Sequence, residues 1–285
     1  MKYFISIGFI CCLVFCSCKE SIKDNVETGY PTHINELIQL TQKYPDSINL
    51  AIKLVNALDS AGLYKEAIEQ VNNLIKTDSL NFGFWNAKAH LQENAKDTIG
   101  AILSYKRAIR VYAAPEAMLT LANLYAETKN DSAILLCNSV NALSADKKYT
   151  ADCKFIEGIY FARIGNTNKA LDLFDECIVN SYTYMVAYLE KGFIYYDRKQ
   201  FKEALEIFTL AATVSNAYAD AYYWQAKCYE AMNNKKDALV NYEKALTLDK
   251  NLTEAGLAIK RLKRKGLEDV FIRMFIKLLE YIAEI

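Results

Sequence analysis

The stretch "GIYFARIGNTNKALDLFDEC" (residues 158–177) contains the pattern that decides the fold. Small or apolar residues stand at five positions separated by 3, 9, 4 and 3 residues: Gly158, Phe161, Ala170, Phe174 and Cys177. Steps of three and four place side chains on one face of a helix. The segment between the two halves, "RIGNTN", carries a glycine that can adopt positive φ in a tight turn. The stretch therefore predicts two amphipathic helices joined as a hairpin.

The same frame recurs along the chain. Its alanine stands at 170, 204 and 238, with a period of 34 residues (204 − 170 and 238 − 204), and 101 − 67 is again 34. The third unit follows the frame with one residue deleted. The first positions of the six units are Val55, Ala89, Ala122, Gly158, Gly192 and Ala226. A constant period of this length indicates a repeat array in which each unit buries its apolar face against its neighbours.

These units resemble the tetratricopeptide repeat family, over roughly residues 33–264. The resemblance implies an all-α solenoid of helical hairpins, a right-handed superhelix of about six repeats plus capping helices. The expected organisation is a lipoprotein signal peptide (1–17), a flexible tether (18–32), an N-terminal capping helix (33–47), six repeat units (48–249), a capping helix (250–266) and an apolar amphipathic C-terminal helix (267–285).

Two features distinguish the C-terminal region. The basic run Lys260, Arg261, Lys263, Arg264 and Lys265 precedes Gly266, which we expect to end the capping helix. The cations are then interpreted as a solvated helix end, stabilised by the helix dipole; attraction to anionic lipid is the alternative. The following segment, "LEDVFIRMFIKLLEYIAEI", has six charges in nineteen residues, which argues against a membrane span. Its wide apolar face must dock on the solenoid, on a second copy or on a membrane surface.

The N-terminus has the features of an export signal. Residues 4–15, "FISIGFICCLVF", are apolar but too short to span a bilayer. The Ser17–Cys18 pair that follows resembles the lipobox of bacterial lipoproteins, although Phe15 and Cys16 depart from its usual leucine and small residue. The resemblance implies lipid attachment at Cys18, and a bacterial cell envelope location, in the outer membrane. Ordinary signal cleavage at another small residue is the competing interpretation.

The resemblance also indicates a binding surface, because the first helix of each tetratricopeptide unit lines a concave groove. In the fourth to sixth units the groove-facing residues are then apolar: Phe155, Ile159, Val186, Leu189, Phe193, Tyr196 and Tyr223. The first three units present polar residues at equivalent places: Asn56, Asp59, Asn86, His90, Glu93, Asn123 and Glu127. We expect a helix or extended peptide of a protein partner to lie in the C-terminal half. The alternative is that these side chains pack between units.

The sequence offers no catalytic set. It has two histidines, no Gly-rich phosphate loop, no nucleophile elbow and no recognisable acid pair, so we predict neither enzyme activity nor a cofactor or metal. Balanced charge, 34 basic against 34 acidic residues, gives no field that favours nucleic acid. Cys137 and Cys177 fall at packing positions and are interpreted as small hydrophobes. Ile52 and Leu119 stand where the family's carboxylate-binding clamp has lysines, so that binding mode is not expected.

Together these features predict a membrane-anchored scaffold or assembly factor of the cell envelope that binds a peptide or helix in its groove. One alternative is a self-associating spacer that dimerises through residues 267–285, and another is a non-catalytic subunit of an envelope enzyme complex. The C-terminal helix has two possible places, in the chain's own groove or in a dimer interface.

Overall fold

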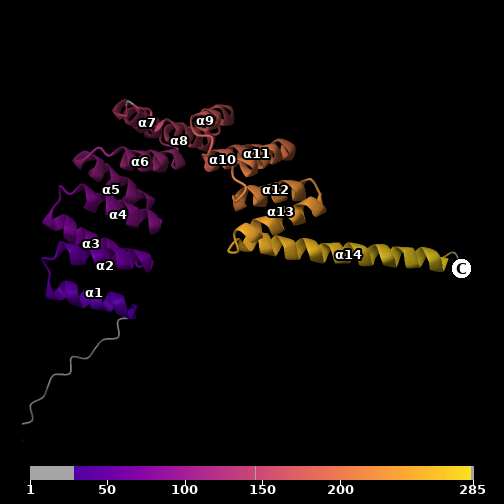
Figure 1. Ribbon diagram of the computed structural model, residues 1–285, viewed down its shortest axis with the longest axis horizontal. Coiled ribbons are helices and arrows are strands. Elements are labelled where there is room, and N and C mark those ends of the chain that lie inside the picture. The colour runs from indigo at the N-terminus through magenta and orange to yellow at the C-terminus, as the bar shows by residue number, and fades with distance from the viewer. Residues whose placement is uncertain (1–28, 145, 284–285) are drawn as a thin grey trace, which may run out of the picture.

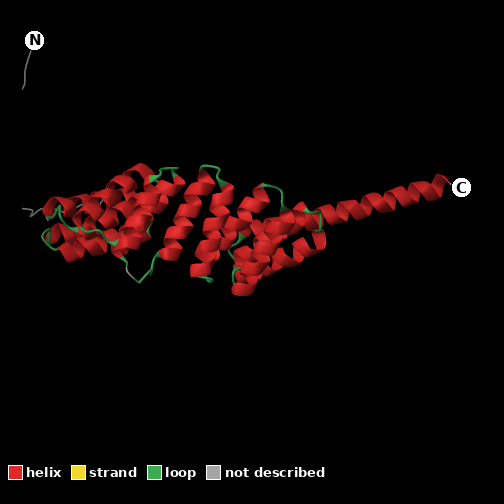
Figure 2. Cartoon of the chain, turned by 90° about the horizontal axis from the view of Figure 1, so that it is seen from above, coloured by secondary structure: helices red, strands yellow, loops and turns green. Residues whose placement is uncertain are grey.

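The computed structural model describes residues 29–144 and 146–283, and all regular structure in these residues is helical (Figure 2). The described part contains fourteen helices: α1 (Thr32–Lys43), α2 (Ile48–Ser60), α3 (Tyr64–Thr77), α4 (Phe82–Asn94), α5 (Thr98–Val111), α6 (Pro115–Glu127), α7 (Ser132–Leu143), α8 (Thr150–Arg163), α9 (Thr167–Asn180), α10 (Met185–Asp197), α11 (Phe201–Val214), α12 (Ala219–Ala231), α13 (Lys235–Leu248) and α14 (Thr253–Ala283).

The helices form hairpins stacked along a curved path, with α7 and α8 near the top of the arch in Figure 1. Six hairpins run from α2–α3 to α12–α13, and each packs against the next through neighbouring helices. Packing of α1 on α2 buries Ile34 completely at the N-terminal end. The predicted all-α architecture of helical hairpins is therefore confirmed.

Every hairpin turns through the same backbone motif. The residue seven places after the frame's first position has a positive φ: Gly62, Lys96, Lys129, Gly165, Lys199 and Asn233. The next residue donates its backbone N–H to a carbonyl five residues earlier, as in Asn166 to Phe161 at 2.8 Å and Gln200 to Tyr195 at 2.9 Å. This is a Schellman motif, which satisfies the last carbonyls of the first helix. The repeat thus encodes the turn as well as the helices.

Small residues at the frame's first position let the two helices of a hairpin approach. A Cβ built on Gly158 would lie 2.6 Å from the Phe174 ring, and one on Gly192 would lie 2.3 Å from the Phe208 ring. Both phenylalanines are fully buried. The glycines are therefore required by the rings that cover them.

The C-terminal region differs from the prediction. A single helix, α14, continues from Thr253 to Ala283 through Gly266, so the predicted helix end at Gly266 and the division of this region into two helices are wrong. Because the helix does not end there, its dipole does not explain the basic run. Arg261 instead pairs with Glu230 of α12 at 2.6 Å, and Lys263 pairs with Glu243 of α13 at 2.9 Å.

The first part of α14 packs on α13, where Ala255, Ala258 and Leu262 are buried. Beyond it, α14 projects away from the hairpins in both views (Figures 1 and 2). Six apolar side chains on this part are 49–65% exposed: Ile272, Met274, Phe275, Ile276, Leu278 and Leu279. No helix in the described residues is both long enough and apolar enough to cross a bilayer.

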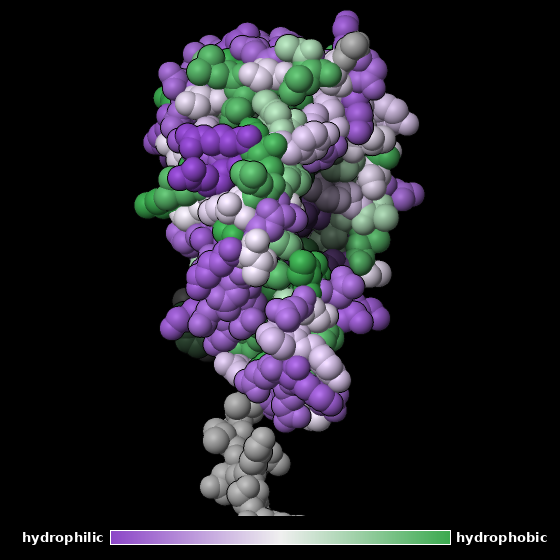
Figure 3. Space-filling model, turned by 90° about the vertical axis from the view of Figure 1, so that its left-hand side faces the viewer, coloured by the Kyte–Doolittle hydropathy of each residue, from purple (hydrophilic) through white to green (hydrophobic). Residues whose placement is uncertain are grey.

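The predicted signal peptide, Cys18 and most of the tether lie outside the described residues. The surface of the N-terminal half mixes polar side chains with separate apolar patches on the face drawn in Figure 3.

Candidate partner-binding groove

The seven predicted groove residues divide by burial. Val186, near the start of α10, is 44% exposed. Ile159 and Leu189 are only 1% and 8% exposed, because they belong to the packed interface between units. These two support the groove from beneath and do not line an open surface, which corrects the prediction for them. The remaining four are half-buried aromatic residues: Phe155, Phe193, Tyr196 and Tyr223.

Three of these aromatic side chains gather around Trp224 of α12. The Trp224 ring centroid lies 4.5 Å from that of Phe193, 5.4 Å from Tyr196 and 5.7 Å from Tyr223. These distances are those of favourable edge-to-face and tilted pairs. We call Phe193, Tyr196, Tyr223 and Trp224 the aromatic wall, formed by α10 and α12. Burial raises the pKa of both Tyr196 and Tyr223, as expected for phenols in this apolar setting.

Trp224 was missed by reasoning from the sequence. It stands two residues before the frame's first position, where the equivalent residue of the fifth unit is the acidic Glu190. The family's groove positions therefore did not indicate it, and the available signal was the aromatic run "YYW" at residues 222–224. Phe155 is separate from the wall and instead packs near Phe174 and Tyr184, at 5.8 and 5.2 Å between ring centroids.

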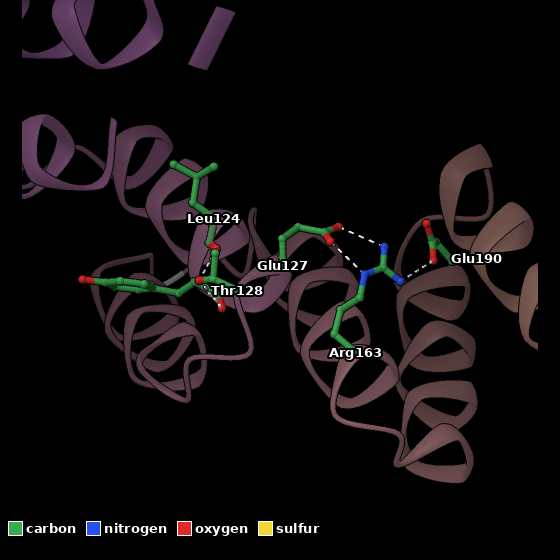
Figure 4. A network of polar contacts seen from close by, with 6 residues as sticks. Leu124, Glu127, Thr128, Arg163 and Glu190 are labelled. Carbon is green, nitrogen blue, oxygen red and sulfur yellow. Dashed lines mark hydrogen bonds and ion pairs between the residues drawn. The ribbon is translucent and has the colours of Figure 1, made fainter. Parts of the chain in front are cut away.

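An ion triad precedes the wall along the array (Figure 4). The Arg163 guanidinium on α8 donates to both carboxylate oxygens of Glu127 on α6, at 2.8 and 3.0 Å, and lies 3.5 Å from a carboxylate oxygen of Glu190 on α10. Burial raises the pKa of Glu190, while Arg163 acts in the opposite direction. The triad links the first helices of three successive units. It contains two carboxylates and one guanidinium.

The N-terminal half contains an apolar pocket that the sequence did not predict. A cavity of about 400 Å³ lies between the first two units, lined by Ile48, Ile52, Val55, Asn56, Val71, Leu74, Asp78, Asn81, Gly83, Phe84 and Ala87. We call it the first-junction pocket. Ile48 and Ile52 are 48% and 38% exposed, so apolar side chains of this pocket are accessible at the surface. The sequence feature that could have indicated this pocket was Ile52, an apolar residue at a groove position.

Several predicted polar groove residues bond within the array. Asp59 accepts a hydrogen bond from Asn94 at 3.1 Å, and Glu93 accepts one from Tyr105 of α5 at 2.5 Å. Burial is the main cause that raises the pKa of Tyr105 above its usual value. Asn56 and His90 are exposed, whereas Asn86 and Asn123 are half-buried. Some of the predicted polar groove residues are therefore engaged in hydrogen bonds between helices and are less available to a partner.

The four cysteines in the described residues are free and buried: Cys137, Cys153, Cys177 and Cys228. Burial raises the pKa of the Cys177 and Cys228 thiols to about 12, so both stay protonated at neutral pH. Over the described part of the chain, no group of three or more histidine, cysteine or acidic side chains is arranged to hold a metal ion.

The repeat geometry and the comparisons with known proteins agree. The family model for the tetratricopeptide repeat matches residues 219–252, which include α12 and α13. This segment of the chain therefore matches a tetratricopeptide repeat, and the whole array has the fold of that family. A tetratricopeptide repeat protein from Parabacteroides merdae has a similar structure, with a TM-score of 0.64 at 17% identity over 81% of this chain and 91% of that one.

Two further proteins are similar. The structure of PilW, described as a widely conserved type IV pilus biogenesis factor, gives a TM-score of 0.57 at 16% identity over 81% of this chain and 99% of that one. Human DnaJ homolog subfamily C member 7 is 24% identical over 214 residues, 72% of this chain. The match spans 39% of the length of that relative. The two structural likenesses show the tetratricopeptide fold.

Proposed function

We propose that this protein is a lipid-anchored scaffold of the bacterial cell envelope that binds a peptide or helix of a partner protein in its groove. The observation that carries the proposal is the aromatic wall on α10 and α12, with the exposed Val186 on the same helix as Phe193 and Tyr196. Half-buried aromatic side chains on a concave helical surface are suited to receive apolar anchors from a partner.

The ion triad narrows the chemistry of the partner. Arg163 offsets one of the two carboxylates that it contacts, so the triad itself keeps a net negative charge. A partner segment with apolar residues at helical spacing and a basic residue at one end is complementary to this surface. Its apolar residues would contact the wall while its cation approaches Glu190.

Affinity capture from detergent-solubilised envelope, with the anchor intact, tests this proposal. Val186→Lys places a charge on the groove side of α10, and Leu210→Lys places the same charge on α11, where Leu210 is 50% exposed. Relative to the wild type, we expect the amount of a specifically captured protein to fall at least tenfold with the Val186 variant and to be unchanged with the Leu210 variant. Equal recovery by both variants would contradict binding in the groove.

The likeness to PilW concerns the fold alone, because the identity is 16%. That protein's description as a pilus biogenesis factor illustrates the class of role that we propose, assembly of an envelope structure. For this chain the role rests on the aromatic wall and the export signal.

The anchor has its own test. The sequence from Met1 to Cys18 supports removal of residues 1–17 and acylation of Cys18. The acyl chains would hold the array at a membrane. The mass of the mature protein tests whether they are present. We expect a mass increment of two or three acyl chains on Cys18, and its loss in Cys18→Ser. A mature protein that begins elsewhere and carries no lipid would contradict the anchor, while the groove proposal would stand.

A second candidate function is self-association through α14. The observation in its favour is the set of six exposed apolar side chains between Ile272 and Leu279. Such a set is costly to leave in water, and in this structure it does not fill the chain's own groove. A homodimer in which these side chains are covered would make the protein a structural spacer.

A further inference from the structure

The junction between the third and fourth units differs from the other junctions. Six residues, 144–149, separate α7 from α8, whereas the other connections between successive hairpins have three or four residues. The third unit is also the one whose frame lacks a residue. A long connection constrains the angle between two hairpins less than a short one, so this junction depends more on contacts between the units.

Two buried thiols meet across this junction. Cys137 of α7 and Cys153 of α8 both have no exposed surface and belong to one core cluster. The Cys153 Sγ donates a hydrogen bond to the Cys137 carbonyl oxygen at 3.5 Å, and the two thiols are close enough that each shifts the pKa of the other. Because the thiol of one cysteine reaches the backbone carbonyl of the other, a small side-chain movement could bring the two sulfur atoms together.

We propose that Cys137 and Cys153 form a disulfide that joins the third unit to the fourth when the chain folds under oxidising conditions. In the reaction one thiolate attacks an external disulfide, such as oxidised glutathione or an oxidised dithiol protein, and forms a mixed disulfide. The second thiolate then displaces the external sulfur. Both S–H bonds and the external S–S bond break, the new S–S bond forms, and two external thiols leave with the protons and electrons.

Burial sets the timing of this reaction. Neither thiol has exposed surface, so an external disulfide cannot reach either sulfur atom in the packed array. Oxidation therefore occurs during folding or when α7 and α8 open, and the closed junction afterwards protects the bond. The biological setting rests on the proposed envelope location, since bacterial envelopes are oxidising. The proximity of the two thiols does not depend on that location, so the disulfide can be tested on the purified protein.

The sequence provides an analytical readout. Trypsin cuts after Lys129, Lys147, Lys148 and Lys154, so Cys137 lies in peptide 130–147 and Cys153 in peptide 149–154. The test is to refold the purified full chain in glutathione redox buffer, block free thiols in denaturant, digest and measure peptide masses. We expect these two peptides joined, at their summed mass less two hydrogen atoms.

The repeat also supplies substitutions suited to the fold. Cys153→Ala installs the residue found at the same place in three other units, Ala117, Ala187 and Ala221, all of them buried. Cys137→Val installs the residue of the first unit, Val71. Cys177→Ala is the matched control, because Cys177 lies in the same core cluster and is not part of the proposed bond.

Oxidation of the wild type and of Cys177→Ala should raise the midpoint of thermal unfolding by about 5 °C, since closing a loop of this size constrains the unfolded chain. Neither Cys153→Ala nor Cys137→Val should show the shift, and either variant suffices if the other fails to fold. Absence of the joined peptides, or their replacement by peptides that contain Cys177, would overturn the proposal. Either result leaves the groove proposal unaffected.

Discussion

At the scale of single residues, the glycines at the frame's first position match the rings that cover them so closely that no space is left for a Cβ. Glycine lies under Phe174 and Phe208, whereas alanine occupies the same place in the units that have Tyr105 and Tyr242. The sequence predicts close approach at these positions because the pattern repeats within one chain. The exact clearance depends on ring orientation, which the repeat pattern does not specify.

A substitution tests this match. Gly192→Ala would place a Cβ 2.3 Å from the Phe208 ring, so we expect a loss of about 1–3 kcal/mol in the free energy of unfolding. Gly256→Ala is the control: its Cβ would lie at an ordinary 3.9 Å from Leu246, and the change should stabilise the helix by about 0.5–1 kcal/mol. Urea unfolding followed by circular dichroism distinguishes the two. Equal effects would contradict the proposed role of Gly192.

A hydrogen bond between a buried tyrosine and a glutamate, repeated in two units, was not predicted from the sequence. Tyr105 donates to Glu93, and Tyr242 donates to Glu230 at 2.9 Å, with the two pairs at equivalent places in the second and sixth units. Glu93 was predicted to face the groove because its frame position is a groove position. Its carboxylate instead turns to the buried phenol, because an unpaired hydroxyl in the core is costly.

At the scale of elements, the hairpin turns were predicted from Gly62 and Gly165 alone. The structure places Lys96, Lys129, Lys199 and Asn233 in the same left-handed conformation. A side chain there costs about 1–2 kcal/mol, which the Schellman hydrogen bonds and the packed hairpin offset. Local sequence preference does not reveal such positions, whereas the repeat period does.

The turns allow a stabilising prediction. Lys199→Gly removes the strain of positive φ without removing a described hydrogen bond of the turn, so we expect a gain of about 0.5–1 kcal/mol in the free energy of unfolding. Gly165→Ala should lose a similar amount, because a Cβ at φ 87° is strained although nothing lies within 4 Å of it. A loss of stability in Lys199→Gly would contradict this account.

The continuity of α14 through Gly266 also has a physical reason that local sequence does not show. One glycine in a helix interior costs about 1 kcal/mol, which strong helix formers on both sides outweigh. Gly266 therefore did not end the helix. The ion pairs of Arg261 and Lys263 with α12 and α13 fix where the first part of α14 lies, and sequence alone does not reveal those partners.

The exposed part of α14 makes a testable prediction about assembly. Phe275→Lys with Leu279→Lys replaces two side chains that are 62% and 51% exposed, so the fold should be unaffected. If the helix self-associates, sedimentation should shift from dimer to monomer in this variant. Leu210→Lys is the matched control and should keep the wild-type mass. A wild type that is already monomeric at micromolar concentration would contradict the self-association alternative.

At the scale of the whole molecule, the period of 34 residues suffices to predict the hairpin array. It does not suffice to predict the groove surface, because exposure there depends on how neighbouring units curve and which side chains fill the space between them. Ile159 and Leu189 are buried for this reason, while Trp224 and the first-junction pocket were not predicted. The aromatic character of the fifth and sixth units could be predicted, and its arrangement around Trp224 could not.

The buried phenols and thiols predict a pH dependence of stability. Burial raises the pKa of Cys228 from 9.0 to about 12 and that of Tyr218 from 10.0 to about 12. Unfolded chains lose these protons first, so the contribution to stability is complete below about pH 9 and is lost as the pH rises toward 12.

Urea midpoints measured from pH 7 to 11 should therefore be constant at first and then decline. Cys228→Ala should reduce the decline, since it removes one of the groups that ionises more readily in the unfolded chain. Alanine is the residue at this place in the first unit, Ala57. An undiminished slope in Cys228→Ala would contradict the assignment of this thiol.

The central claim, that a partner lies in the groove beside the aromatic wall, is tested most directly by site-specific photo-cross-linking in cells. A photoreactive amino acid is placed at Val186, the exposed residue of α10 that is predicted to face the groove, and, as the matched position, at Leu210 on α11. We expect a discrete cross-linked species from position 186 that is absent from position 210 and lost when Trp224 is replaced by alanine. The same products from both positions, or none from position 186 while position 210 gives a discrete species, would contradict it.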